Sequence, residues 1–230
     1  MEKKLSIVIP VYNEEKLVLK SLRPILELPI NKEVIVIDDG SKDDTINLLH
    51  KLQDKYQFKL LIQEINQGKG AAVRKGLENI SGDFFIICDA DLEYNPSDIV
   101  TLFKRIQKYD QTKEKIAIYG SRFLVNNRIS FHYLVNAFLT KLTNILFKTK
   151  LTDMETCFKL IPSKSLEEIK LYGDRFEIEP EITAQLIKNG YQIKEIPISY
   201  NRRGYIDGKK ITAKDGLMAV QAIISQRFKR

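Results

Sequence analysis

Asp89 and Asp91 are separated by one residue, a spacing that suggests a metal-binding site. They follow the apolar run of residues 84–88, which has the composition of a buried strand. In an extended segment residues i and i+2 point to the same side, so both carboxylates can share one divalent cation. Oxygen ligands favour Mg²⁺ or Mn²⁺, usually completed by water and substrate phosphates. A solvated turn with helix-capping acids is the alternative that the spacing leaves open.

Two further polar clusters also follow apolar runs. Asp38 and Asp39 end the run of residues 33–37, where a buried carboxylate needs a partner such as a nucleobase, a ribose or a metal-bound diphosphate. The segment Asn66-Gln67-Gly68-Lys69-Gly70 begins a predicted helix. Glycines and a lysine at a helix N-terminus are typical of a phosphate cradle, but a plain tight turn explains them too.

The elements that must position these clusters alternate along the first half of the chain. Short apolar runs predict strands at residues 5–10, 33–37, 59–63, 84–88 and 116–119, and longer periodic stretches predict helices at 14–28, 43–56, 69–80 and 96–109. This alternation predicts an α/β fold with an open, mostly parallel sheet and helices on both faces. Ligands bind at the carboxyl ends of such strands, so the polar clusters should converge on one rim.

The second half of the chain is richer in helical patterns. An amphipathic helix with a wide apolar stripe is predicted over residues 131–146, with lysines beside it. A strand at 156–162, helices at 163–171 and 179–189, a strand at 193–200 and an amphipathic helix at 212–228 follow. No linker or repeat interrupts the sequence, so residues 1–230 are predicted to form a single domain.

Composition narrows the class of protein. The 230 residues carry a net charge of +7, with 43% hydrophobic and 29% charged residues, which is an ordinary globular balance. Two cysteines without CxxC spacing, Cys88 and Cys157, exclude a disulfide-dense scaffold and a zinc finger. No apolar run reaches the roughly 20 residues of a membrane-spanning helix, and the N-terminus does not resemble a signal peptide. We therefore expect a cytoplasmic protein with an anionic partner.

In their order along the chain these segments resemble the family-2 glycosyltransferases of the GT-A (Rossmann-like) fold, and most closely the polyprenyl (dolichyl) phosphate mannosyl- and glucosyltransferase branch. The segments that carry the resemblance are SIVIPVYNEE (6–15), VIVIDDGSKDDT (34–45), NQGKGAAVRKG (66–76), GDFFIICDADLEYNP (82–96), YGSRF (119–123), LTDMETCFKL (151–160), FEIEPEIT (176–183) and GYQIKEIPISY (190–200). They cover nearly the whole chain.

The resemblance implies a role for particular residues. The donor nucleotide sugar would be held by Pro10, Tyr12, Glu14, Asp38, Asp39, Lys69, Asp89 and Ala90. Asp89, Asp91 and Glu93 would hold the metal, although the family often has Gln at the position of Glu93. Arg122, Asp153, Arg203 and Lys209 would join Asp91 at the reaction centre, with the last two on a loop over the donor. In other branches a carboxylate near Asp153 or Glu155 activates a hydroxyl acceptor.

The implied reaction is an inverting, metal-dependent transfer of a hexosyl group from a GDP-mannose or UDP-glucose type donor to a polyprenyl phosphate, as in a dolichyl-phosphate beta-mannosyltransferase. Residues 1–120 would bind the nucleotide sugar, and residues 121–230 would face the acceptor and the membrane. The two amphipathic helices suit an anionic bilayer surface, although packing on the sheet explains them as well. The protein would be peripheral on the cytosolic face of a membrane, with or without an anchoring partner protein.

Two alternatives stay open. The same fold and donor could serve a hydroxyl acceptor in a cell-wall, capsule or lipid glycan. A basic nucleic-acid-binding module is the remote alternative, and we expect no nucleic-acid partner. The basic residues do not alternate with stacking aromatics, and acidic pairs on the rim would repel phosphate in the absence of a metal.

Overall fold

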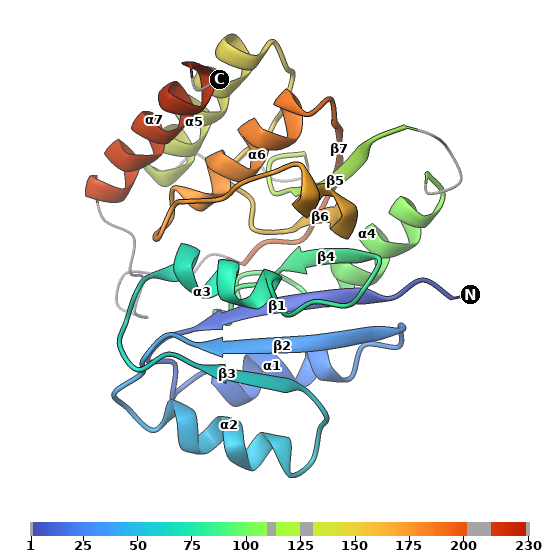
Figure 1. Cartoon of the computed structure of the whole chain (residues 1–230), viewed down its shortest axis with the longest axis vertical. Coiled ribbons are helices and arrows are strands. Elements are labelled where there is room, and N and C mark those ends of the chain that lie inside the picture. The colour runs from blue at the N-terminus through green and yellow to red at the C-terminus, as the bar shows by residue number, and fades with distance from the viewer. Residues whose placement is uncertain (1, 110–113, 125–130, 202–212, 229–230) are drawn as a thin grey trace.

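The computed structural model describes residues 2–109, 114–124, 131–201 and 213–228. Strands and helices alternate through the first half, as the sequence predicts (Figure 1). The elements there are β1 (Leu5–Val11), α1 (Val18–Leu26), β2 (Lys32–Asp38), α2 (Thr45–Gln53), β3 (Lys59–Ile62), α3 (Lys69–Leu77), β4 (Phe84–Ile87), α4 (Ser97–Gln107) and β5 (Ile116–Ser121). The second half contains α5 (Phe131–Phe147), β6 (Lys159–Pro162), the short 3₁₀ helix η1 (Ser163–Glu167), α6 (Ile178–Lys188), β7 (Gln192–Pro197) and α7 (Ala213–Phe228).

A seven-stranded sheet of order β3-β2-β1-β4-β6-β5-β7 forms the centre of the structure. Strands β1, β2, β3 and β4 pair in parallel, and β5 is parallel to β7. Strand β6 runs antiparallel to both of its neighbours, β4 and β5. The predicted mostly parallel α/β fold is therefore confirmed.

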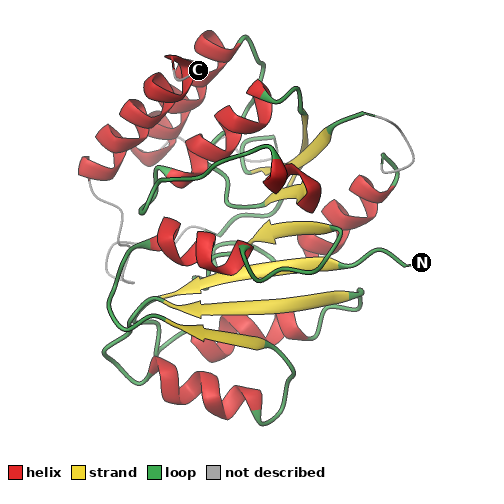
Figure 2. Ribbon diagram, viewed as in Figure 1, coloured by secondary structure: helices red, strands yellow, loops and turns green. Residues whose placement is uncertain are grey.

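Helices cover both faces of the sheet (Figure 2). On one face α1, α2 and α4 pack through side chains such as Leu22, Leu49 and Leu102 onto Ile7 and Val36 of the sheet. On the other face α3 and α6 pack through Val73 and Ile182. Because both faces are covered, the central strands are buried along nearly their whole length, which explains their continuous apolar sequences.

Helices α5 and α7 lie side by side outside α6 (Figure 1). A third apolar cluster, formed around Leu139, Met154 and Ile223, joins them to the chain beneath. Each helix nevertheless exposes large apolar side chains: Leu134, Phe138 and Ile145 on α5, and Leu217, Ile224 and Phe228 on α7. Packing accounts for only part of each stripe. None of the helices in the described ranges is long and apolar enough to cross a bilayer.

Two predicted elements of the second half differ from the structure. The helix predicted over residues 163–171 is wrong, because only the 3₁₀ turn Ser163–Glu167 forms before the chain turns back toward α3. The strand predicted from residue 156 begins only at Lys159, since the Lys159 amide donates to the Cys157 carbonyl in a tight turn.

Candidate active site

The loops that follow β1 and β2 are joined by reciprocal hydrogen bonds. The Asn13 amide donates to Ser41 Oγ over 2.8 Å, and the Lys42 amide donates to Asn13 Oδ1 over 2.8 Å. The Glu14 amide donates to Thr45 Oγ1 over 2.9 Å. Asn13 adopts a positive φ of 49°, which turns the chain after β1. These contacts hold the segment containing Pro10, Tyr12 and Glu14 next to the end of β2, as the sequence predicts.

Asp39 is buried, and each of its carboxylate oxygens accepts two hydrogen bonds from the protein. Its Oδ1 accepts hydrogen bonds from Gln63 Nε2 (2.6 Å) and the Gln67 amide (2.8 Å). Its Oδ2 accepts from Asn66 Nδ2 (2.9 Å) and the Gly68 amide (2.9 Å). Asp39 therefore ties the end of β2 to the loop before α3.

Asp38, in contrast, keeps an unused acceptor. Its Oδ2 accepts from the Ser41 amide over 2.9 Å, whereas its buried Oδ1 meets no hydrogen-bond donor among the described residues. A buried carboxylate oxygen without a donor is costly. Of the two adjacent aspartates, Asp38 is thus the one with bonding capacity to offer a ligand.

The glycine-rich start of α3 packs against protein backbone. The Ala71 amide donates to the Asp174 carbonyl over 3.1 Å, and Arg74 bonds the Gly173 carbonyl. A Cβ on Gly70 would lie 2.2 Å from the Gly173 carbonyl oxygen, so only glycine allows this approach. Together with the bonds to Asp39, these contacts support the tight-turn interpretation of residues 66–70 and account for the glycine.

Asp89 and Asp91 follow β4, but their carboxylates have different surroundings. Asp91 Oδ1 accepts the Glu93 amide over 3.0 Å, and Leu92 between them has a positive φ of 62°. Asp89 has a side chain that is 26% exposed, and both of its oxygens lie against the ammonium of Lys69, at 2.8 and 2.9 Å. Ala90 is buried between the two aspartates.

Lys69 links Asp89 to a buried ion pair. Its ammonium lies 3.0 Å from Glu179 Oε1, and Glu179 Oε2 pairs with the fully buried Lys159. Burial by itself would lower the pKa of Lys69, but Asp89 and Glu179 together hold that pKa well above its usual value. Burial would likewise raise the pKa of Glu179, and the ammonium groups of Lys159 and Lys69 hold it below its usual value. Lys69 and Glu179 are therefore both charged near neutral pH.

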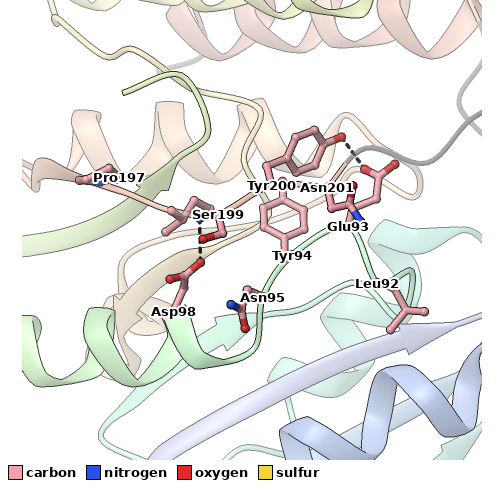
Figure 3. A pocket seen from close by; sticks show the side chains of 10 residues that line it. Leu92, Glu93, Tyr94, Asn95, Asp98, Pro197, Ser199, Tyr200 and Asn201 are labelled. Atoms are coloured by element: carbon pink, nitrogen blue, oxygen red, sulfur yellow. Dashed lines mark hydrogen bonds between the residues drawn. The ribbon is translucent and has the colours of Figure 1, made fainter. Parts of the chain in front are cut away.

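The donor set fits a divalent cation that is completed by a ligand. In the described part of the chain, no three His, Cys, Asp or Glu side chains come together as a metal centre. Glu93 is nearly buried and its Oε2 accepts the Tyr200 hydroxyl over 2.5 Å (Figure 3). Asp89 and Asp91 remain as carboxylates at the rim. One or two carboxylates, with a diphosphate and water, are the usual ligands of Mg²⁺.

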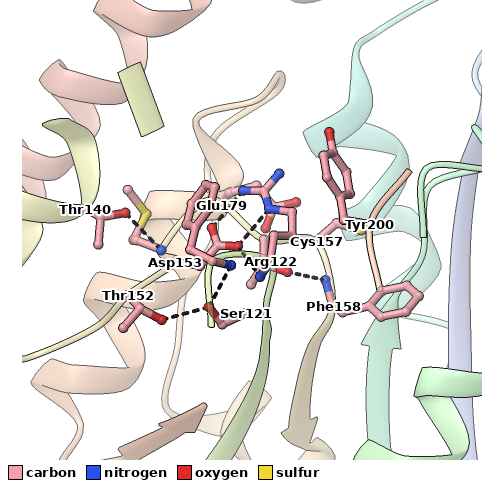
Figure 4. Close-up of polar contacts among 12 residues, drawn as sticks. Ser121, Arg122, Thr140, Thr152, Asp153, Cys157, Phe158, Glu179 and Tyr200 are labelled. Atoms are coloured by element: carbon pink, nitrogen blue, oxygen red, sulfur yellow. Dashed lines mark hydrogen bonds and ion pairs between the residues drawn. The ribbon is translucent and has the colours of Figure 1, made fainter. Parts of the chain in front are cut away.

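Arg122 and Asp153 form a buried bidentate ion pair (Figure 4). Arg122 Nε and Nη2 each donate to an Asp153 oxygen over 2.7 Å, and the Arg122 amide donates to the same carboxylate over 2.9 Å. The guanidinium also lies 5.3 Å from the ring centre of Tyr200 and 6.0 Å from that of Tyr94. Both oxygens of Asp153 are thus occupied in orienting Arg122.

Glu155 lies in the same segment with a carboxyl that is incompletely bonded. Its buried Oε1 meets no hydrogen-bond donor among the described residues. Burial raises the pKa of Glu155 to about 7, an effect that Glu179 and Asp153 strengthen and that Lys159 and Arg122 oppose. A carboxyl that titrates near neutral pH can exchange a proton there.

A pocket lies beside this cluster, between residues 92–98 and residues 197–201 (Figure 3). Tyr94 and Tyr200 form an isolated antiparallel bridge, with ring centres 5.4 Å apart. Asp98 accepts the Ser199 amide over 2.8 Å at the opposite side of the pocket. The pocket thus opens between the segment that follows Asp91 and the chain at the end of β7.

The predicted loop residues Arg203 and Lys209 lie outside the described residues. Sequence reasoning missed two charged residues of the site, Lys159 and Glu179. Their signal is visible only in retrospect, as a lysine that begins the otherwise apolar strand β6 and as one of two acids in the first turn of α6.

Comparison with known proteins agrees with this architecture. The chain has the α/β fold of the GT-A glycosyltransferases. It superposes on glucosyl-3-phosphoglycerate synthase from Mycobacterium tuberculosis, which was solved in complex with UDP. The TM-score is 0.70 at 17% identity, and the superposition covers 98% of this chain and 80% of that one. A second structure of that enzyme, with Mn²⁺, UDP and phosphoglyceric acid, gives a TM-score of 0.70 at 16% identity, over 98% and 79% of the two chains.

Sequence comparison identifies the family. Residues 6–170 match the model of glycosyl transferase family 2, and the chain belongs to this family. It is 30% identical to an uncharacterised protein of Methanocaldococcus jannaschii, over 89% of this chain and 93% of that protein. It is also 30% identical to the dolichyl-phosphate beta-glucosyltransferase of Saccharomyces cerevisiae and 29% identical to one from Trichomonas vaginalis. These two matches cover 90% of this chain in each case, and 69% and 68% of the respective relatives.

Proposed function

We propose that this chain transfers glucose from UDP-glucose to a polyprenyl phosphate with inversion at the anomeric carbon. The observation that carries the proposal is the rim after β4, where Lys69 pairs with Asp89 two residues before Asp91, together with the ion-paired Arg122 directly after β5. A departing diphosphate develops negative charge. It is stabilised by fixed positive groups and by a cation, which the carboxylates can bind.

Glucose rather than mannose is proposed because the named relatives are dolichyl-phosphate glucosyltransferases. The fold neighbour from Mycobacterium tuberculosis binds UDP, which supports uridine over guanosine. The buried free oxygen of Asp38 is the proposed acceptor for a nucleoside donor group. Tyr12 and Glu14, held beside it by the β1 and β2 loops, would complete the nucleoside site.

Within this reaction each charged group has a distinct task. Asp89 and Asp91 would hold Mg²⁺ or Mn²⁺, which supplies positive charge to the departing diphosphate. Arg122, fixed by Asp153, would orient the acceptor phosphate, and Arg203 and Lys209 would contribute further positive charge. A phosphate acceptor is already an anion, so it needs orientation more than a strong base.

Membrane docking is proposed for the exposed apolar side chains of α5 and α7. Phe138 is 58% exposed and Phe228 is 74% exposed, and the charged residues Lys141, Lys148 and Arg227 lie on the same helices or just beyond their ends. Apolar side chains flanked by cations suit an interfacial helix on an anionic bilayer. Such docking would place residues 121–230 toward the lipid acceptor and residues 1–120 toward the cytosolic donor, with or without an anchoring partner protein.

Transfer of radiolabelled sugar tests the proposal. The purified chain is incubated with polyprenyl phosphate vesicles and either UDP-[¹⁴C]glucose or GDP-[¹⁴C]mannose, with Mn²⁺ or with EDTA. We expect label from UDP-glucose in a solvent-extractable, mild-acid-labile lipid, and only when metal is present. Label from GDP-mannose alone would reassign the sugar. A lack of lipid product from either donor would contradict the acceptor.

A hydroxyl acceptor is the alternative, and Glu155 is the observation that favours it. A carboxyl with a pKa of about 7 suits a general base that accepts a proton from a hydroxyl. In addition, a fold neighbour was solved with the soluble acid phosphoglyceric acid. The two functions differ in their response to Glu155→Gln: phosphate glycosylation should survive the change, whereas hydroxyl glycosylation should fall by roughly a hundredfold or more.

A further inference from the structure

The ammonium of Lys69 is placed against both oxygens of Asp89, at 2.8 and 2.9 Å. A cation in contact with both carboxylate oxygens uses the acceptor positions through which a divalent ion would bind. The Lys69 side chain is only 11% exposed, so this contact is shielded from water and is stronger than a surface ion pair. Lys69 is therefore a competitor for any metal at Asp89.

The charges around this contact already balance. Asp89 and Glu179 supply two carboxylates, and Lys69 and Lys159 supply two ammonium groups. A divalent ion added to this group leaves uncompensated positive charge in a partly buried region, which is unfavourable. A diphosphate that arrives with the ion would restore the balance.

Lys69 can leave Asp89 without depriving Glu179, its other partner, of a positive charge. Glu179 keeps its ion pair with Lys159, whose ammonium is fully buried and also donates to the Thr156 carbonyl over 2.6 Å. Lys159 itself is held too deeply to replace Lys69 at the rim. Movement of one flexible side chain is thus enough to exchange the partner of Asp89.

We propose that Lys69 is the resident counter-cation of Asp89 in the ligand-free protein and that a nucleoside diphosphate takes over its ammonium, freeing Asp89 for the metal. This inference rests on the proposed function, because it assumes that a diphosphate and a metal share the rim. It makes Lys69 a coupling residue: nucleotide and metal each bind more tightly when the other is present. By linkage the two enhancement factors must be equal.

Manganese binding without turnover tests this coupling. Free Mn²⁺ is counted by electron paramagnetic resonance in titrations of the full chain, with and without UDP. The variant Lys69→Met removes the competing ammonium and leaves Glu179 paired with Lys159. The matched control is Lys75→Met, which removes the same charge from the same helix at a position where the ammonium donates to the Ile62 carbonyl over 2.7 Å.

For the unmodified chain we expect UDP to tighten Mn²⁺ binding by about tenfold or more, given the strength of partly buried charge pairs. Lys69→Met should bind Mn²⁺ more tightly than the unmodified chain in the absence of UDP, and UDP should then tighten Mn²⁺ binding by a smaller factor than in the unmodified chain. Lys75→Met should behave as the unmodified chain. The affinity for UDP, measured calorimetrically with and without Mn²⁺, should change in the unmodified chain by the same factor.

Three results would overturn the inference while leaving the proposed function in place: Mn²⁺ binding that is equally tight with and without UDP, an unchanged affinity in Lys69→Met, or an equal gain in Lys75→Met. Because Mn²⁺ binding with and without UDP is measured in the unmodified chain, equally tight binding would overturn the inference even if Lys69→Met fails to fold. Failure of the unmodified chain to bind UDP under any condition would instead refute the proposed function.

Discussion

Replacing Glu155 with glutamine should stabilise the protein above neutral pH, by an amount that follows from its surroundings. Burial raises the pKa of Glu155 from 4.5 to about 7. Glutamine has nearly the same shape and stays neutral at every pH. The variant therefore removes the cost of ionising a buried carboxyl without creating a cavity.

The sign of the effect follows from proton linkage. Below about pH 4.5 the carboxyl is protonated in both the folded and the unfolded chain, so it contributes no pH dependence. Between 4.5 and 7 the unfolded chain ionises while the folded chain keeps its proton, and the free energy of unfolding falls as pH rises. The full cost is reached above about pH 7 and corresponds to about 3 kcal/mol.

Urea unfolding from about pH 5 to about pH 8 measures this difference, since the transition gives a free energy at each pH. The advantage of Glu155→Gln over the unmodified chain should grow with pH and level off near 3 kcal/mol. Glu64→Gln, the same change at an exposed side chain, is the control and should leave the curve unchanged. Parallel curves for Glu155→Gln and the unmodified chain would refute the assignment of a buried, proton-retaining carboxyl.

Three further predictions concern the metal, the α3 turn and the membrane. Asp91→Asn keeps an oxygen for the Glu93 amide, so its melting temperature should hold while metal-dependent transfer falls roughly a hundredfold; unchanged turnover would remove Asp91 from the site. Gly70→Ala should lower the free energy of unfolding by about 2 kcal/mol because its Cβ meets backbone. Gly216→Ala in α7, with open space around the Cβ, should not destabilise the chain, and an equal loss in both would contradict the packing argument. Phe138→Glu should reduce co-sedimentation with anionic vesicles without changing the melting temperature. Gln221→Glu adds the same charge at an exposed position of α7 and should leave co-sedimentation unchanged. Equal vesicle binding by the two variants would argue against docking through α5.

The elements of the first half could be predicted because each buried strand is a short, continuous apolar run. Their ends were less predictable. The helix expected from residue 14 begins at Val18, because residues 13–15 are used in bonds to Ser41 and Asp43 of another loop and to Thr45 at the start of α2. Such contacts join residues that are far apart in sequence, so local patterns do not reveal them.

The same limit applies to the site. The convergence of the strand ends was predictable because the carboxyl ends of parallel strands share one edge. The pairing of Lys69 with Glu179 was not, because these residues are 110 positions apart in the chain. An acid in the first turn of a helix is ordinarily explained by the helix dipole, so Glu179 gave no distinct signal.

The antiparallel strand β6 has a consequence for how the molecule can be divided. It inserts a piece of the second half between β4 and β5, both of which come from the first half. A fragment that stops at residue 120 would leave β4 as a bare apolar edge and β5 detached from every neighbour, a form prone to self-association. The strand order therefore joins the predicted donor half and acceptor half within a single sheet.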